Sequence, residues 1–319
     1  ISRQINKISN IFHEKINIIY KFLITCSELL KLQNIHSLEL NFSDIQKNLD
    51  RFLPSLNKKL YQSEPSFFTN KGNIFSTYYT LLDIKDELKP IILFVSEIDY
   101  YTSICLLYNK FIDKDNKYSL ANYIEQKNVK LTLDECWHPY LDNKPVLNNI
   151  ILNKNIIITG PNAAGKSTFI KTVLINILLA QTISLSSSSN MDFTIFKNLN
   201  SYLHIPDTKG KESLFEAEMN RSLNYIKYLK THKDDKSLII MDELFSSTNN
   251  KEGIEAAKIV CKEMIKFKNS LTLLTTHYGE LASLEKDTKR FRNYKFLIKR
   301  DKNNNIIFTY KLKKGFSKD

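Results

Sequence analysis

The chain has 319 residues, of which 42% are hydrophobic and 25% are charged, and its formal net charge is +12. This composition is typical of a globular chain long enough for two domains, and it excludes a disordered or collagen-like protein. The lysine and arginine residues concentrated after residue 286 fit attraction to nucleic acid, and they fit a generally Lys/Asn/Ile-rich composition equally well.

Targeting signals and cysteine spacing favour an intracellular protein. The most apolar segment, residues 91–107, carries Glu97 and Asp99 near its middle, where a bilayer disfavours charge. No signal-peptide pattern is present, and the four cysteines form no CxxC pair. We therefore expect a cytoplasmic or nuclear protein in a reducing compartment, with no membrane partner. Because the sequence begins with Ile1 rather than Met, we also expect a fragment or a processed chain.

The first 128 residues predict an all-helical region. Apolar residues recur at helical spacing over residues 6–33 and 94–111. Proline and glycine interrupt the pattern at Pro54, Pro65 and Gly72. The Lys89–Pro90 step predicts a further helix start. A long helical arm is the simplest interpretation, and a helical bundle with no task of its own is the alternative.

Residues 129–319 predict an α/β domain. Short apolar runs alternate with helical stretches at residues 129–133, 155–159, 237–241 and 271–275. Such buried strands between helices are typical of a mostly parallel sheet with helices on both faces. Residues 294–312 predict a hairpin with an Asn-rich turn.

A glycine-bounded loop follows the second of these strands. Residues 160–167, GPNAAGKS, fit the phosphate-binding pattern GxxxxGK[ST] and precede a helical stretch. Gly160 and Gly165 would let the backbone N–H groups face a phosphate, and the helix N-terminus adds positive potential. Lys166 would reach the β- and γ-phosphates. The sequence therefore predicts a nucleotide site.

Four further side chains predict magnesium binding and hydrolysis. Ser167 would bind Mg²⁺, and Thr168 would contact the α-phosphate. The apolar strand SLIIM ends in Asp242 and Glu243. Asp242 would hold Mg²⁺ through water, and Glu243 could orient and polarise the attacking water.

A histidine follows the apolar run LTLLTT. Most single histidines are structural, but His277 should emerge at the sheet edge where ligands bind. We interpret it as a sensor of the γ-phosphate.

The ordered motifs TGPNAAGKST, LLAQT, SLFEAEM, MDELFSSTNNKEG and TTHYGEL together resemble the ATPase domain of the MutS family. These are DNA mismatch-repair and related recombination proteins with an ABC-type nucleotide-binding fold. The resemblance covers residue 128 to the C-terminus and extends weakly over residues 96–108. Residues 134–152 also resemble the family's "RHP…N" approach to the loop. It implies an ABC-type P-loop ATPase domain preceded by an all-α lever or clamp region.

The resemblance also assigns roles by position. The run Gly160-Pro161-Asn162 is the family's start of the loop, and Gln181 occupies the Q-loop place near Mg²⁺. Ser213 falls where the family has a serine that reaches the γ-phosphate of the opposite subunit. The match to that signature is completed by Phe215, Glu218 and Met219. Val146 to Asn148 fall where the adenine is usually held.

The same resemblance implies cofactors and partners. ATP and Mg²⁺ would be bound, and hydrolysis would need two ATPase domains face to face in a homodimer or heterodimer. The partner would be double-stranded DNA, mismatched or branched, although the mismatch-reading domain is absent from this sequence. Many relatives have GRGTS where this chain has residues 245–249, FSSTN, so we expect communication across the dimer to differ.

Two other functions stay open at this point. The altered segment after Glu243 favours a scaffold for branched DNA with little turnover, whereas the retained Lys166, Asp242, Glu243 and His277 favour hydrolysis. A nucleotide-binding subunit of an ABC transporter shares the loop, the carboxylates and the histidine. However, it would carry an LSGGQ-like signature, where this chain has residues 209–219, KGKESLFEAEM.

Overall fold

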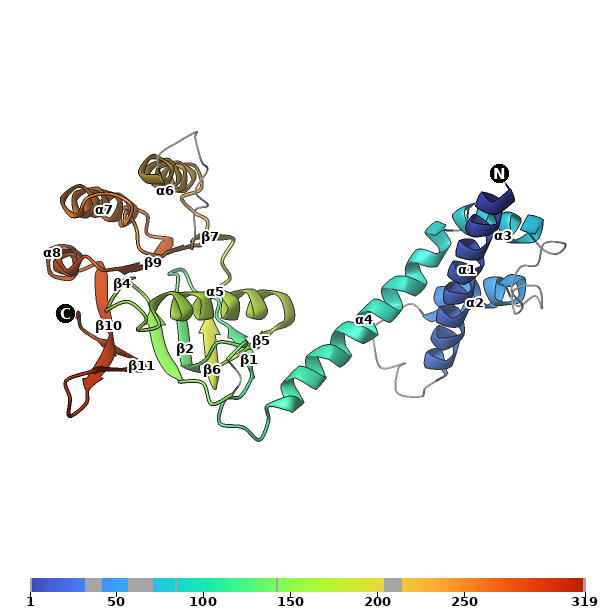
Figure 1. Cartoon of the computed structure of the whole chain (residues 1–319), viewed down its shortest axis with the longest axis horizontal. Helices are drawn as coiled ribbons and strands as arrows, with labels where there is room; N and C mark the ends of the chain where they lie inside the picture. Colours follow the sequence, from blue (N-terminus) through green and yellow to red (C-terminus); the bar gives the residue numbers. More distant parts are fainter. Residues whose placement is uncertain are drawn as a thin grey trace. The chain divides into compact units, whose positions relative to one another are not determined.

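The computed structural model describes residues 2–31, 42–56, 71–83, 85–141, 143–203 and 214–317. The chain forms two compact units, residues 1–105 and 106–319 (Figure 1). The units therefore divide inside helix α4 (Lys85–Lys110), whereas the change in sequence texture predicts a boundary after residue 128. Strand β1 (Ser119–Tyr123) lies between these two positions and pairs with strands of the second unit.

The described part of the first unit is entirely helical, as the apolar spacing predicts. It contains α1 (Ser2–Leu30), α2 (Phe42–Leu56), α3 (Lys71–Asp83) and the first part of α4. One stripe of α1, which includes Ile16, Leu23 and Leu30, is buried against apolar residues of the other three helices. Because these residues repeat every seven positions, they share one face of the helix. The core of this unit is therefore formed by the apolar faces of amphipathic helices.

The prolines of this unit do not end its helices. Pro54 lies inside α2 and Pro90 lies inside α4, so the predicted helix start at Lys89–Pro90 is wrong. Pro90 is the sixth residue of α4, beyond the four N-terminal N–H groups that have no intrahelical partner, so it removes one helical hydrogen bond. Gly72 is the second residue of α3, and Pro65 lies outside the described residues.

One helix among the described residues is long and apolar enough to cross a membrane by length and composition alone. It is the stretch Leu88–Lys110 of α4, with a mean hydropathy of 1.4, and 11% of its most apolar window is buried. Glu97 and Asp99 lie in the middle of this stretch.

The second unit is built on a six-stranded sheet, ordered β11-β10-β4-β9-β8-β7. Its strands are β4 (Asn155–Thr159), β7 (Asn198–Tyr202), β8 (Ser237–Met241), β9 (Ser270–Thr276), β10 (Phe291–Arg300) and β11 (Ile306–Lys314). All neighbouring strands are parallel except β11, which forms an antiparallel hairpin with β10. The predicted mostly parallel sheet and the predicted hairpin are both confirmed.

Helices cover both faces of this sheet (Figure 1). Helix α5 (Lys166–Ile183) packs on one face, against Ile156 and Ile158 among others. The other face is covered by α6 (Leu214–Thr231), α7 (Asn250–Met264) and α8 (Leu284–Thr288). Every residue of β4, β8 and β9 is buried, which explains the apolar runs of β4 and β8, whereas β9 combines leucine with serine and threonine.

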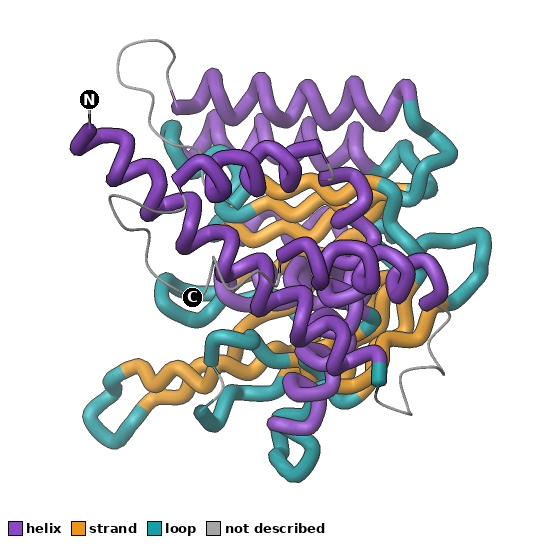
Figure 2. The backbone as a smooth tube through the Cα atoms, turned by 90° about the vertical axis from the view of Figure 1, so that its right-hand side faces the viewer, coloured by secondary structure: helices purple, strands orange, loops and turns teal. Residues whose placement is uncertain are grey.

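A second sheet of five strands lies beyond α5 and is not predicted by the sequence. Its order is β3-β2-β6-β1-β5, and it comprises β1, β2 (Leu131–Cys136), β3 (Asn148–Leu152), β5 (Leu185–Ser186) and β6 (Asn190–Phe193). Apolar residues of β2, β3 and β6 share one core with α5 and the large sheet. Helix α5 is therefore buried between two sheets. Figure 2 shows the strands in orange and the helices in purple.

Candidate nucleotide-binding site

The glycine-bounded loop connects β4 to α5 at the carboxyl edge of the large sheet. Gly165 immediately precedes α5 and has a φ of 98°, a left-handed conformation that favours glycine. A Cβ atom at this position would also lie 3.2 Å from the ring of Tyr310. The loop thus presents the first N–H groups of a buried 18-residue helix to the space above the sheet.

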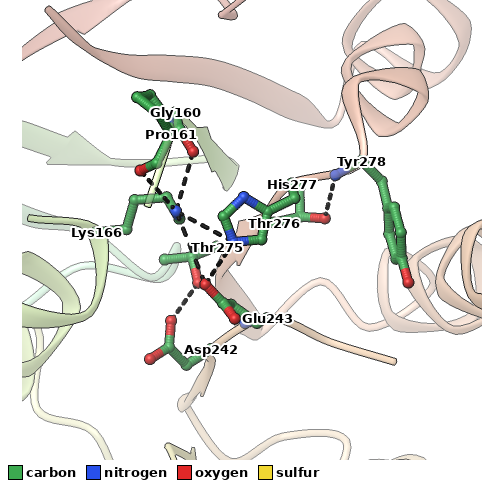
Figure 3. Close-up of polar contacts among 9 residues, drawn as sticks. All are labelled: Gly160, Pro161, Lys166, Asp242, Glu243, Thr275, Thr276, His277 and Tyr278. Atoms are coloured by element: carbon green, nitrogen blue, oxygen red, sulfur yellow. Dashed lines mark hydrogen bonds and ion pairs between the residues drawn. The ribbon is translucent and has the colours of Figure 1, made fainter. Parts of the chain in front are cut away.

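Lys166 is the first residue of α5, and its ammonium group is turned back toward the loop (Figure 3). Its Nζ donates to the backbone oxygens of Gly160 at 3.0 Å and Pro161 at 3.1 Å. It also lies 3.8 Å from a carboxylate oxygen of Glu243. The side chain is 4% exposed, and this burial lowers the pKa of Lys166, while the charges of Glu243 and Asp242 oppose that shift. The buried ammonium group of Lys166 is therefore held beside the backbone of the loop.

Two carboxylates and a histidine converge from neighbouring strands. Because β8 and β9 are adjacent and parallel, the residues that follow them emerge at the same edge as the loop after β4. His277 Nε2 lies 2.6 Å from Glu243 Oε1 and 3.4 Å from Lys166 Nζ (Figure 3). The structure thus brings together three residues that are separated by up to 111 positions in the sequence.

Thr275, to which the sequence pattern assigns no role, holds the two carboxylate residues in place. Its hydroxyl donates to the carboxylate of Asp242 and accepts the backbone N–H of Glu243 at 3.0 Å. Glu243 has a φ of 51°, a conformation in which few non-glycine residues are found. Thr275 therefore supports the backbone turn that aims Glu243 at the site.

A cavity of about 700 Å³ opens beside the loop. Residues from several separated segments line it, including Val146, Asn148, Asn162, Gly165, Lys166, Ser167, Thr168 and Glu243. All of these belong to the predicted site. Gly160, Pro161 and His277 line a separate hollow on the other side of the loop. The cavity is large enough for a nucleotide-sized ligand.

Several aromatic side chains line this cavity without having been predicted. They include Trp137 and His138, which follow β2, and Tyr310, which lies on β11. Burial, followed by the charge of Lys171, lowers the pKa of His138. Tyr310 lies against the loop at Gly165 and is 46% exposed. Its sequence signal, an aromatic in a hairpin strand, does not reveal that the hairpin reaches a loop 145 positions earlier.

Asn148 lines the cavity, and its amide also makes three hydrogen bonds to backbone groups. Its Nδ2 donates to the backbone oxygens of Val146 and Tyr310, and its Oδ1 accepts the N–H of Leu312 at 2.7 Å. Since these contacts occupy its amide, Asn148 connects β3 to β11 and holds Tyr310 in place. Val146 lines the cavity directly.

Gln181 lies far from the predicted magnesium ligands, so its assignment as a Q-loop residue is corrected. It is on the same helix as Ser167 and 14 positions later, which corresponds to about 21 Å along the axis. Its amide forms reciprocal hydrogen bonds with the backbone of Phe196 at 3.1 and 2.8 Å. Gln181 therefore secures the far end of α5. Ser213 lies outside the described residues.

The donor set fits a magnesium ion only together with phosphate oxygens. Ser167 and Asp242 supply one hydroxyl and one carboxylate, which are hard oxygen ligands of the type Mg²⁺ prefers. Within the described residues, no group of three or more His, Cys, Asp or Glu side chains is placed to hold a metal. This combination is typical of sites where a nucleotide brings the ion with it.

Trp137 offers a direct optical test of the cavity, because it is the only tryptophan in the chain. It is 1% exposed, and its ring lies 5.2 Å from the ring centroids of both Phe111 and Tyr118. We expect Mg-ATP to change its fluorescence in a saturable way, since the residue lines the cavity. Calorimetric titration of ATP provides the comparison. Binding by calorimetry without any change in Trp137 emission would contradict the placement of the nucleotide in this cavity.

The sequence is similar to known proteins along most of its length. The family model for MutS domain V matches residues 156–319. The chain is 27% identical to the DNA mismatch repair protein MutS of Finegoldia magna over 316 residues, which are 98% of this chain and 36% of that protein. It is 30% identical to MutS protein homolog 4 of Mus musculus over 215 residues, 63% of this chain and 22% of the relative.

A third similar protein is the DNA mismatch repair protein MutS of Thermotoga maritima. It is 32% identical over 158 residues, which are 49% of this chain and 19% of that protein. The chain thus spans about a third or less of the length of these relatives.

Proposed function

Because this chain belongs to the MutS family, we propose that it binds double-stranded DNA and uses ATP to switch that binding. In this proposal the second unit is an ABC-type P-loop ATPase, and the first unit is its lever or clamp. The observation that carries it is the convergence of Lys166, Glu243 and His277 at one edge of the sheet, beside the loop that precedes α5. Mismatch repair is the process we favour.

ATP would be held by the loop and by the cavity beside it. The N–H groups of residues 160–167 and the ammonium group of Lys166 would bind the β- and γ-phosphates. Thr168 would contact the α-phosphate. Ser167 and Asp242 would hold Mg²⁺, which neutralises charge that develops on the phosphates.

Glu243 would orient the attacking water and accept its proton. The carboxylate is one-third exposed and is contacted by His277 Nε2 at 2.6 Å, so it is held at the open side of the site. His277 would sense the γ-phosphate through the same nitrogen. The intact Lys166, Asp242, Glu243 and His277 set favours turnover over a scaffold that only binds ATP.

Hydrolysis would require two copies, or one copy and a related chain, facing each other. Ser213 would then complete the site of the opposite subunit, as in the family resemblance. Double-stranded DNA, mismatched or branched, is the proposed partner.

Tyr310 would stack on the adenine base. We expect Tyr310→Ala to weaken ATP binding about tenfold, since stacking on an aromatic ring contributes on the order of 1–3 kcal/mol. Tyr310→Phe keeps the ring and should bind like the unaltered chain. Tyr140→Ala is the matched control, because Tyr140 is 87% exposed and does not line the cavity. Equal ATP affinity in Tyr310→Ala and Tyr140→Ala would contradict the stacking role.

Binding to three DNAs tests the proposed function. A perfect duplex, a duplex with one mismatch and a four-way junction are compared with and without ATP at one salt concentration, because phosphate contacts make affinity salt-dependent. Preference for the mismatch with release by ATP supports a repair function. Preference for the junction supports a recombination function instead. Binding to none of the three DNAs contradicts the proposal.

A further inference from the structure

Two side chains of the segment that follows Glu243 contact helix α6, one through an aromatic ring and one through a hydrogen bond. Residues 244–247 form a turn after β8, and the chain departs there from the GRGTS pattern described above. Phe245 and Ser247 occupy the positions at which that pattern has glycine. A glycine has no side chain, so every side-chain contact that these two residues make is an addition of this chain.

The first contact joins Phe245 to Phe215, which lies in the first turn of α6. Their ring centroids are 5.5 Å apart, with 57° between the ring planes, and Phe245 is completely buried. The backbone oxygen of Phe245 accepts a hydrogen bond from the Tyr278 hydroxyl at 2.7 Å. A Cβ atom at Gly253 would lie 2.4 Å from that hydroxyl, so glycine leaves room for the arrangement. The turn is therefore held in one position.

The second contact joins Ser247 to Glu218, one turn further along α6. Ser247 Oγ donates to Glu218 Oε2 at 2.5 Å, and Glu218 is 4% exposed. A buried carboxylate needs hydrogen-bond donors, because burial removes it from water. The Ser247 hydroxyl supplies one from an otherwise exposed residue. We call the Phe245–Phe215 and Ser247–Glu218 contacts the α6 clasp.

We propose that Phe245 and Ser247 are positioning residues, which hold the start of α6 in place for the ATP site of the partner subunit. Ser213 immediately precedes α6 in the sequence. With the α6 clasp intact, the start of α6 is fixed to the turn that follows Glu243 in the same chain. The position of each catalytic carboxylate is thereby coupled to the segment that acts in the opposite site. This inference rests on the proposed ATPase function and assigns its coupling between subunits.

Mixed dimers separate an effect in the partner's site from an effect in the chain's own site. In the reference mixture, a small amount of wild-type chain meets an excess of Glu243→Gln chain, so that only the wild-type site can hydrolyse ATP. In the second mixture, the excess chain carries Ser247→Ala in addition to Glu243→Gln. In the third mixture, Ser247→Ala chain meets an excess of the Glu243→Gln chain.

We expect the second mixture to hydrolyse ATP about tenfold more slowly than the reference and the third to stay within about twofold of it. Ser247→Thr keeps the hydroxyl and, in place of Ser247→Ala in the excess chain, should restore the reference rate. Ser246→Ala is the matched control, since Ser246 is in the same turn and is exposed. Thermal melting of every variant shows whether each chain is folded.

Three results overturn the inference. The second mixture could run at the reference rate, the third could be as slow as the second, or Ser247→Thr could fail to restore the rate in a folded chain. Absence of ATP hydrolysis by the wild-type chain at any concentration is a different result, because it overturns the proposed function and the inference with it.

Discussion

Replacing Glu243 with glutamine is expected to lower the rate of ATP hydrolysis by about 10²–10⁴-fold and to leave ATP affinity nearly unchanged. Glutamine keeps the shape of the side chain and removes its ability to accept a proton. Glu243 is not a predicted phosphate ligand, and its Oε1 is already close to His277 Nε2 at 2.6 Å. Single-turnover phosphate release and equilibrium ATP binding measure the two quantities separately.

A matched control for this substitution is Glu255→Gln on α7. Glu255 is 63% exposed and pairs only with the nearby Lys258 in the described structure, so its loss should leave turnover unchanged. Turnover by Glu243→Gln at the rate of Glu255→Gln would show that Glu243 is not the general base.

Replacing Lys166 with methionine is expected to weaken ATP binding about 100-fold. Charge-assisted hydrogen bonds contribute about 1.5–3 kcal/mol each, and the ammonium group is placed to make such bonds with phosphate. Because burial lowers the pKa of Lys166, a neutral side chain of similar length should fit the fold without a large loss of stability. ATP titration and thermal melting together distinguish lost binding from lost folding.

The exposed Lys230 on α6 provides the control for charge alone, since Lys230→Met removes one positive charge far along the chain from the loop. ATP affinity of Lys166→Met equal to that of Lys230→Met would contradict the assignment of the phosphate-binding lysine.

The large sheet and its edge were predictable because their signals are local. β4, β8 and β9 are buried on both faces, and such strands are rich in apolar and β-branched residues that stand out in a sequence. The parallel arrangement then determines where the following residues emerge. For this reason the mutual proximity of Lys166, Glu243 and His277 follows from motif order and sheet geometry.

The small sheet was not predictable from its strands. β1 (SLANY), β5 (LS) and β6 (NMDF) are short and partly polar, so neither hydrophobic alternation nor an apolar run identifies them. They are stabilised by strand pairing, of β6 with β2, β1 with β6 and β5 with β1, and by the core that surrounds α5. Tertiary packing determines the structure of these strands, and the local sequence pattern does not reveal that packing.

The errors in the predicted site have the same cause, because the positions of these residues also depend on tertiary structure. Gln181 was assigned by motif order alone, and helix geometry places it at the opposite end of α5 from Ser167. Tyr310 was missed because its contact with Asn148 joins β3 to β11 across 162 positions. The Ser247–Glu218 contact likewise depends on how α6 packs beside the turn after β8.

The most direct test of a shared ATP site is the rate of ATP hydrolysis per chain as a function of chain concentration, at saturating Mg-ATP. If two chains complete each other's sites, the rate per chain rises with concentration and reaches a plateau where sedimentation shows that dimers have formed. A rate per chain that is constant from well below to well above that concentration would contradict hydrolysis at a composite interface.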